Sequence, residues 1–220
     1  MEHQNVPNPI LSCVLKGDLE GLQKLLMDVA NPRHKKVLQP LLEYDIVERS
    51  PVHIACVLGH SNIIQEFAKY NVNLNDSTTR GYVPLHYAAA WGHLQAVKTL
   101  VELGADIQAV NFLGESARDI ALRYAKQDCV EFLDWAEAKL SLQMYISSVH
   151  SAVTEQEKGK INKEEKVRCL SACKAKSEWL TNVKNPTKQD LMDQKQQLEG
   201  AVLPTLTKLH PERVKSGKLL

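Results

Sequence analysis

The chain has 220 residues, enough for one large domain or two small ones. Its 27 lysines and arginines against 26 aspartates and glutamates give a net charge of +1, which predicts no nucleic-acid or membrane-surface partner. No apolar run approaches the roughly 18–20 residues of a membrane span, and the N-terminus lacks the pattern of a secretory signal. Five cysteines, an odd number without CxxC spacing, favour a reduced cytoplasmic compartment, with a nuclear or cytoskeleton-associated pool as an alternative.

Few aromatic residues and many Ala, Leu, Lys, Glu and Gln predict a mainly helical chain. A first pair of helices is expected over residues 8–27, where Asn8-Pro9 opens a helix and Gly17-Asp18 marks a turn. Compared with the later spacing, about nine additional residues follow, so we expect an insertion near 28–45. Because loops accept length at low free-energy cost, this insertion is either functional or simply tolerated.

An internal period, seen in the interval from His53 to His86, is the strongest signal in the sequence. Ser50-Pro51-Val52-His53-Ile54-Ala55 recurs as Val83-Pro84-Leu85-His86-Tyr87-Ala88, and Gly59-His60 recurs after the same interval as Gly92-His93. Pro51 and Pro84 suit the first turn of a helix, and Gly59 and Gly92 allow the positive φ of a tight helix-helix turn. One period shared by several markers predicts a stack of similar units.

These markers resemble the ankyrin family, through both P-[VL]-H-x-A strings, both Gly-His pairs and Leu103-Gly104-Ala105-Asp106 with Asn111 after it. The resemblance implies an all-α solenoid over 1–139 with repeats at about 8–27, 46–78, 79–111 and 112–139, each two helices and a hairpin loop. In the last repeat Ala117 and Asp119 replace the proline and histidine, a loss of pattern that terminal repeats often show.

Beyond about residue 140 the period stops, and residues 140–210 predict a small bundle of two or three antiparallel helices. Asn185-Pro186 separates two apolar stripes, Pro204 predicts a kink or break in the second, and residues 211–220 are expected to form a flexible tail. The apolar spacing from Val130 to Met144 also permits one continuous helix around 128–154 to link the halves.

Residues 142–210 resemble the C-terminal helical lid of the Hsp70 chaperones. The match is collinear and includes Leu142-x-x-Tyr145, Lys158-Gly159-Lys160-Ile161-Asn162, Trp179-Leu180 and Lys208-Leu209. Because the chain has neither the nucleotide-binding domain nor the peptide-binding sandwich of those proteins, the resemblance implies neither ATP hydrolysis nor peptide capture.

The ankyrin resemblance implies a concave protein-binding groove, formed by the ends of the first helices and by the hairpin loops. Trp91 is its leading candidate, because it lies at the end of a first helix; the alternative is that it only packs against neighbours. The full set of expected contact residues is Val57, Leu58, Ala90, Trp91, Arg123 and Tyr124 on the helices and Arg49, Thr79, Arg80, Tyr82, Phe112 and Leu113 on the hairpins.

No catalytic, cofactor or metal site is predicted. His53 and His86 could be catalytic bases or metal ligands, but in ankyrin repeats the matching histidine bonds backbone groups, so we expect structural roles for them and for Gly59, Gly92, Pro51 and Pro84. Cys169 and Cys173, four residues apart, could hold a metal or form a redox pair, although buried cysteines are common. Ser216-Gly217-Lys218 lacks most of a phosphate-binding loop.

The leading hypothesis is a non-enzymatic adaptor that binds one protein in the groove and uses the C-terminal bundle to bind another or to form a homodimer. One alternative is regulation of an Hsp70-type chaperone through the lid-like segment. Another is a structural role in a cytoskeletal or axonemal assembly. An enzyme is disfavoured, because no set of residues forms a recognisable active site.

Overall fold

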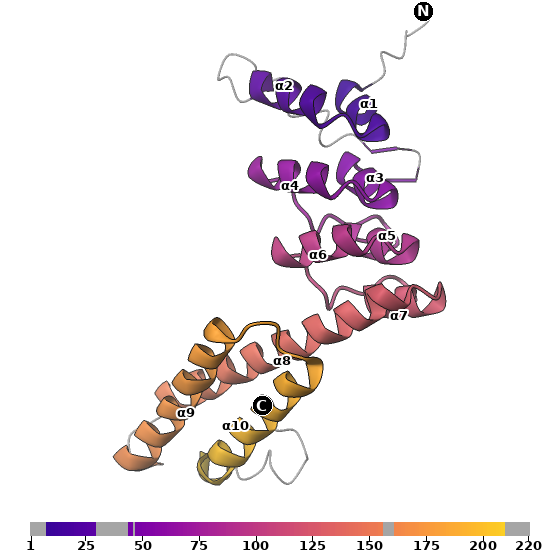
Figure 1. The fold of residues 1–220 in the computed structure, drawn as a ribbon. Coiled ribbons are helices and arrows are strands. Elements are labelled where there is room, and N and C mark those ends of the chain that lie inside the picture. The colour runs from indigo at the N-terminus through magenta and orange to yellow at the C-terminus, as the bar shows by residue number, and fades with distance from the viewer. Residues whose placement is uncertain (1–7, 30–43, 46, 156–160, 210–220) are drawn as a thin grey trace, which may run out of the picture. The chain divides into compact units, whose positions relative to one another are not determined.

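The computed structural model describes residues 8–29, 44–45, 47–155 and 161–209 (Figure 1). Within these ranges the regular secondary structure is helical, apart from an isolated bridge between Val110 and Ser116. The helices are α1 Pro9–Lys16, α2 Leu19–Val29, α3 Pro51–Leu58, α4 Ser61–Lys69, α5 Pro84–Trp91, α6 Leu94–Glu102, α7 Ala117–Arg123, α8 Gln127–Thr154, α9 Lys163–Asn182 and α10 Lys188–Leu209. The chain divides into two compact units, Met1–Leu133 and Asp134–Leu220.

The first unit is a two-layer stack of helix pairs (Figure 1). The first helices α1, α3, α5 and α7 contact one another in chain order, and the second helices α2, α4 and α6 form the other layer. One apolar core runs through the stack, with Leu22, Ile64, Leu85 and Leu100 completely buried. The start of α8 contributes Cys129, Val130 and Leu133 to this core and so acts as the second helix of the last repeat.

A glycine at the end of a first helix permits close approach of the next repeat. Gly59 ends α3 with φ +75° and directs the chain into α4. The His93 ring of the next repeat lies over it and bonds the Val57 carbonyl oxygen through Nε2 at 2.9 Å. A Cβ on Gly59 would lie 2.6 Å from His93 Nδ1. The glycine is therefore required both by its φ and by the space that the histidine takes.

The last repeat makes the same turn without glycine. Ala125 stands one repeat after Gly92 and has φ +55°, in the left-handed region that an L-residue adopts at a cost of roughly 1–2 kcal/mol. Its backbone still forms the turn, since Ala125 N–H donates to the Leu122 carbonyl oxygen at 3.0 Å. The repeat pattern thus persists in backbone shape where the sequence pattern has faded.

The second unit packs the later part of α8 with α9 and α10 around a separate core. Leu142 and Val149 of α8 and Leu191 and Leu198 of α10 are completely buried in it. The Trp135 indole N–H donates to the carbonyl oxygen of Pro186 at 2.8 Å, and this bond fixes the α9–α10 connection against α8. A bundle of helices is therefore present in the region where the sequence predicts one.

Two boundaries differ from the simplest expectation. Helix α8 is unbroken from Gln127 to Thr154, so the expected division at 139/140 lies inside a helix, and the compact units separate at Leu133 instead. Helix α10 continues through Pro204, which therefore does not break it.

Most of the expected insertion near 28–45 and all of the tail 211–220 lie outside the described residues. No helix in the described part of the chain combines the length and apolar character needed to cross a membrane.

We predict that Gly59→Ala destabilises the fold more than Gly104→Ala. Both glycines have positive φ, +75° and +86°, so each substitution should cost about 1 kcal/mol in backbone strain. Only at Gly59 would the new methyl meet His93, whereas a Cβ on Gly104 has nothing within 4 Å, so a further cost of about 1–3 kcal/mol is expected. Urea unfolding of both variants measures the difference, and equal losses would contradict the proposed contact between repeats.

Candidate protein-binding surface

Three large side chains form a ladder across successive first helices. Leu58, Trp91 and Tyr124 occupy equivalent positions of consecutive repeats, at the ends of α3, α5 and α7. Their exposed fractions are 39%, 59% and 53%, although the helices that carry them are anchored in the core. Trp91 is absent from the buried core cluster, which argues against the alternative that it serves only to pack. We call these three residues the helix-end ladder.

The residues one position earlier are less uniform. Val57 and Ala90 are half-buried, and Arg123 is exposed. The Arg123 guanidinium lies 5.1 Å from the centre of the Tyr124 ring and forms an ion pair with Glu115 at 3.2 Å. Val57 uses its carbonyl oxygen to accept from His93, so its contribution to the repeat stack is through the backbone.

Three of the hairpin residues expected in the site, Arg80, Tyr82 and Phe112, form one aromatic cluster. The Tyr82 and Phe112 ring centres are 6.2 Å apart, and the Arg80 guanidinium lies 5.7 Å from the Phe112 ring centre. Phe112 N–H donates to the Arg80 carbonyl oxygen at 2.9 Å, which ties one hairpin to the next. Leu113, beside Phe112, is also exposed. The cluster therefore joins two consecutive repeats.

Arg49 lies one hairpin before Arg80, Thr79 directly precedes Arg80, and both residues have polar partners. Arg49 forms an ion pair with Asp45 at 2.7 Å, and the Asp45 carboxylate also accepts from the backbone N–H groups of Val47 and Arg49. These bonds hold the pKa of Asp45 below its usual range, although burial opposes them. Thr79 contributes its backbone N–H, which donates to the Glu48 carboxylate at 2.7 Å.

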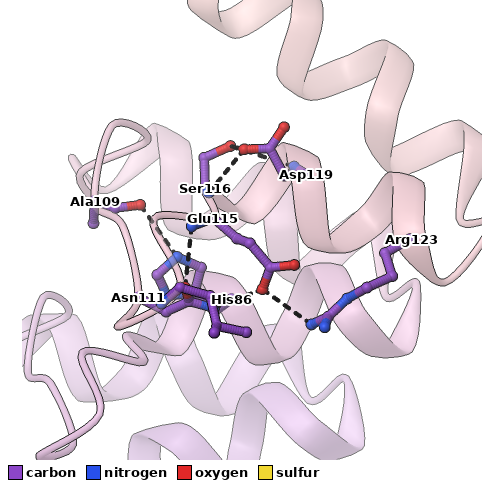
Figure 2. Close-up of polar contacts among 8 residues, drawn as sticks. His86, Ala109, Asn111, Glu115, Ser116, Asp119 and Arg123 are labelled. Carbon is purple, nitrogen blue, oxygen red and sulfur yellow. Dashed lines mark hydrogen bonds and ion pairs between the residues drawn. The ribbon is translucent and has the colours of Figure 1, made fainter.

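Each of two buried histidines fixes a helix start to a distant hairpin. The N–H of Val83 donates to His86 Nδ1 at 3.0 Å, and His86 Nε2 bonds the Ala109 carbonyl oxygen at 3.1 Å (Figure 2). His53 does the same between Ser50 and Asp76, at 3.2 and 3.1 Å. Because Nδ1 accepts, the proton must lie on Nε2 and both rings are neutral. Burial lowers the pKa of both histidines.

The last repeat replaces this histidine with a carboxylate. Asp119 stands one repeat after His86 and accepts from the Ser116 N–H at 2.9 Å and the Ser116 hydroxyl at 2.7 Å. These bonds lower the pKa of Asp119. The neighbouring Glu115 carboxylate accepts a hydrogen bond from the Asn111 amide at 2.9 Å and forms an ion pair with Arg123 at 3.2 Å. Figure 2 shows these residues together. The last hairpin is thus held by an acidic side chain at the start of α7 and another within the loop.

Sequence reasoning missed two residues beside this cluster, Glu48 and Tyr87. Tyr87 packs edge-on against His53, with ring centres 5.5 Å apart, and its ring centre lies 5.8 Å from that of Tyr82. Glu48 stands in the repeat register at the position of Gly81 and Gly114. The replacement of glycine by Glu48 at this position is visible in the sequence, but the repeat period does not explain why a glutamate is there.

The two C-terminal cysteines occupy a closed environment. Cys169 and Cys173 lie four residues apart on α9 and are both buried. Burial raises the pKa of Cys173 to about 11, so its reactive thiolate form is scarce at neutral pH. Among the described residues no group of three or more His, Cys, Asp or Glu side chains is placed to hold a metal. Ser216-Gly217-Lys218 lies outside the described residues.

Comparison with known proteins agrees with this geometry. The family model described as ankyrin repeats (3 copies) matches residues 10–111. Human ankyrin repeat domain-containing protein 45 is 52% identical over 99% of this chain and 83% of its own length. The chain belongs to the ankyrin-repeat family. The zebrafish (Danio rerio) protein of the same name is 45% identical over 95% of each chain. Mouse protein phosphatase 1 regulatory subunit 12A is 32% identical over 41% of this chain and 8% of its own length.

The near-complete coverage by the first two relatives has a further consequence. Because these alignments span 99% and 95% of the chain, they extend well beyond the matched repeats at 10–111 and include the second unit. The pairing of ankyrin repeats with this C-terminal helical region is therefore shared with those proteins. The likeness to the Hsp70 lid is a separate matter and stays a prediction.

We predict that the protein loses stability as the pH falls from about 6.5 to about 5. His53 and His86 have folded-state pKa values below their ordinary value, so in this range the unfolded chain binds protons that the folded chain does not. The stability that depends on neutral rings is complete above the unfolded pKa of about 6.5 and decreases below it. Urea unfolding from pH 8 to pH 5 measures this slope.

A His86→Asn variant is the matched control, because an amide does not titrate in this range. Its unfolding free energy should be lower at pH 8 and should depend less on pH between 6.5 and 5. The carboxylates with lowered pKa, such as Asp119, contribute their pH dependence mainly below about pH 4.5. An unchanged slope in the variant would contradict the role assigned to His86.

Proposed function

We propose that the protein is a non-catalytic adaptor. It binds a partner protein on the helix-end ladder and on the aromatic cluster of the hairpins, which contains Arg80, Tyr82 and Phe112. The observation that carries this proposal is the exposure of Leu58, Trp91 and Tyr124 in one register, at the ends of helices whose other side chains contribute to the core. Aromatic and arginine side chains dominate the binding energy of protein interfaces. Here they are prearranged on a stacked scaffold, which lowers the entropy lost on binding.

The ankyrin-repeat membership supports the same role. Repeat stacks generally present extended surfaces to other proteins. Mouse protein phosphatase 1 regulatory subunit 12A, which is similar over part of this chain, is by its name a regulatory subunit of a phosphatase. All five cysteines are free and buried, which fits the cytoplasmic location that we propose, with a nuclear or cytoskeleton-associated pool as the alternative.

The double variant Trp91→Ala, Arg80→Ala should lose the partner while keeping its fold. Both side chains are exposed, so the melting temperature should change little, whereas loss of two interface anchors of about 2 kcal/mol each would lower affinity by roughly several hundredfold. Quantitative affinity purification followed by mass spectrometry compares the variant with the original chain. Recovery of the same proteins in undiminished amounts would show that this surface is not the binding site.

A matched control is Leu103→Ala, Lys24→Ala. Leu103 and Lys24 are also exposed, but they lie at the end of α6 and within α2, in the second helix layer. This control removes a large apolar side chain and one cation from the other layer. It should bring down the same partners as the unmodified chain.

We further propose that the C-terminal unit is a second contact module. Large apolar side chains are exposed on each of its three helices, Met144 on α8, Val167 on α9 and Met192 on α10. The candidate contacts are a second copy of this chain, an Hsp70-type chaperone, as the lid resemblance implies, or a cytoskeletal assembly. The exposed residues favour a contact of this unit but do not select among the three.

Two measurements on the full chain separate these contacts. If the lid-like segment docks on a chaperone, calorimetric titration into a purified cytosolic Hsp70 should give heat that Met144→Glu, Met192→Glu abolishes. If it forms a homodimer, light scattering should give twice the 24.7 kDa chain mass. Absence of heat at high micromolar concentration, with a monomer mass, would leave only the cytoskeletal contact, which co-sedimentation with microtubules tests.

A further inference from the structure

Glu48 occupies a backbone position that elsewhere in the stack belongs to glycine. It stands one repeat before Gly81 and two before Gly114, and all three residues have positive φ, +61°, +73° and +75°. Its turn is held by local bonds, since Glu48 N–H donates to the Asp45 carbonyl oxygen at 2.9 Å. A residue with a side chain is unfavourable there, and glycine would be the unstrained choice. The strain points to a use for the side chain.

The Glu48 carboxylate lies at a surface hollow with aromatic walls. It accepts from the Thr79 N–H at 2.7 Å, and the hollow is also lined by Thr78, Tyr82 and Tyr87. The two tyrosine rings are 5.8 Å apart between centres and tilted by 43°. The hollow therefore combines one carboxylate with two neighbouring aromatic side chains.

The buried histidines hold both tyrosine rings in position. His53 packs edge-on against Tyr87, with ring centres 5.5 Å apart, and His86 packs against Tyr82 at 5.8 Å. Because each imidazole is itself fixed by bonds from both nitrogens, the rings are oriented before any ligand arrives. A preformed aromatic site loses less entropy when it binds.

The charges around the hollow favour a cationic ligand. Arg49 is neutralised by Asp45 at 2.7 Å. Arg80 also lines the hollow; its guanidinium lies 5.7 Å from the Phe112 ring centre on the following hairpin, and its positive charge still acts on the Glu48 carboxylate. Glu48 has no salt bridge to a described residue, and hydrogen bonding from Thr79, with a smaller contribution from the Arg80 charge, lowers its pKa and keeps it ionised at neutral pH. A carboxylate beside two aromatic side chains is complementary to a lysine or arginine side chain.

We propose that this hollow binds a lysine or arginine side chain of the partner segment, with Glu48 as the counter-charge and Tyr82 and Tyr87 as the aromatic walls. The inference rests on the proposed function, because it names a feature of the partner that binds the same face. It also explains why a strained glutamate stands where glycine would fit. Glu48 is then a specificity-determining residue, selecting partners by one basic side chain.

The experiment selects peptides from a random phage-displayed library on the immobilised full-length chain and measures each peptide by fluorescence anisotropy. We expect the selected peptides to share a lysine or arginine. Glu48→Gln keeps an oxygen for the Thr79 N–H but removes the charge, and it should weaken these peptides by about tenfold or more. Glu102→Gln, which removes an exposed carboxylate from the end of α6, should leave affinity unchanged.

Charge exchange provides the sharper test. Replacing the shared basic residue of a peptide by glutamate should abolish binding to the original chain and restore it with Glu48→Lys. The losses from Glu48→Gln and from the neutral peptide should not add, as expected for two groups in contact.

The possible failures point to different conclusions. Peptides that depend on Trp91 but are indifferent to Glu48→Gln, or that share no basic residue, would overturn this inference and leave the adaptor proposal intact. If no selected peptide is weakened by Trp91→Ala or Glu48→Gln, both proposals are wrong.

Discussion

The repeat stack depends on a neutral, buried imidazole that bonds two distant backbone groups, one at the start of its own helix and one in the next hairpin. In His53 and His86 one nitrogen accepts from the residue three before it, and the other donates to a carbonyl 23 residues later. A protonated ring would lose its acceptor, and a shorter side chain could not reach both groups. The bond that joins each of these two hairpins to the preceding helix therefore depends on a neutral imidazole.

This constraint also organises the surface. Tyr82 lies against His86, and Phe112 belongs to the hairpin whose Ala109 carbonyl that same histidine holds. The distance between the rings of the aromatic cluster is therefore set by the hydrogen bonds from His86 to the backbone. Exposed aromatic side chains on an unsupported loop would sample many rotamers, whereas here the loop itself is anchored in the core. The same interaction thus serves the stability of the stack and the preorganisation of the proposed binding surface.

The ends of the stack show what happens when the constraint is relaxed. In the fourth repeat the second helix, α8, continues to Thr154 at the point where the earlier repeats turn into a hairpin. The bond to a following hairpin is therefore not needed, and Asp119 supplies only the bonds at the helix start. In the first repeat Asn8 does similar work, accepting from Ile10 and Leu11 at 2.9 and 3.1 Å. Both terminal repeats thus keep a side-chain cap at the start of the first helix, and the last repeat has no following hairpin to be linked.

The sequence was most informative where a local rule and the repeat period agree. Pro51 and Pro84 begin α3 and α5, and Gly59 and Gly92 end them with positive φ, because each residue meets a backbone requirement that the sequence itself states. The division of the chain was harder to predict. Helix α8 contains no proline or glycine between Gln127 and Thr154, so its boundary depends on which core each turn faces, and that is decided by tertiary packing.

Some residues of the candidate surface could likewise be predicted from the repeat period, and others could not. Leu58, Trp91 and Tyr124 could be placed from the period alone, since equivalent positions share an environment, but their exposure depends on the packing of neighbouring repeats. Tyr87 could not, because its importance comes from contact with His53 of the preceding repeat. Glu48 differs from both. A residue that breaks the period at a strained position carries information that the period lacks, since a stack selected for stability alone would have glycine there. Under the proposal that Glu48 contacts a basic side chain, this departure from the repeat is the place where a common scaffold gains its specificity.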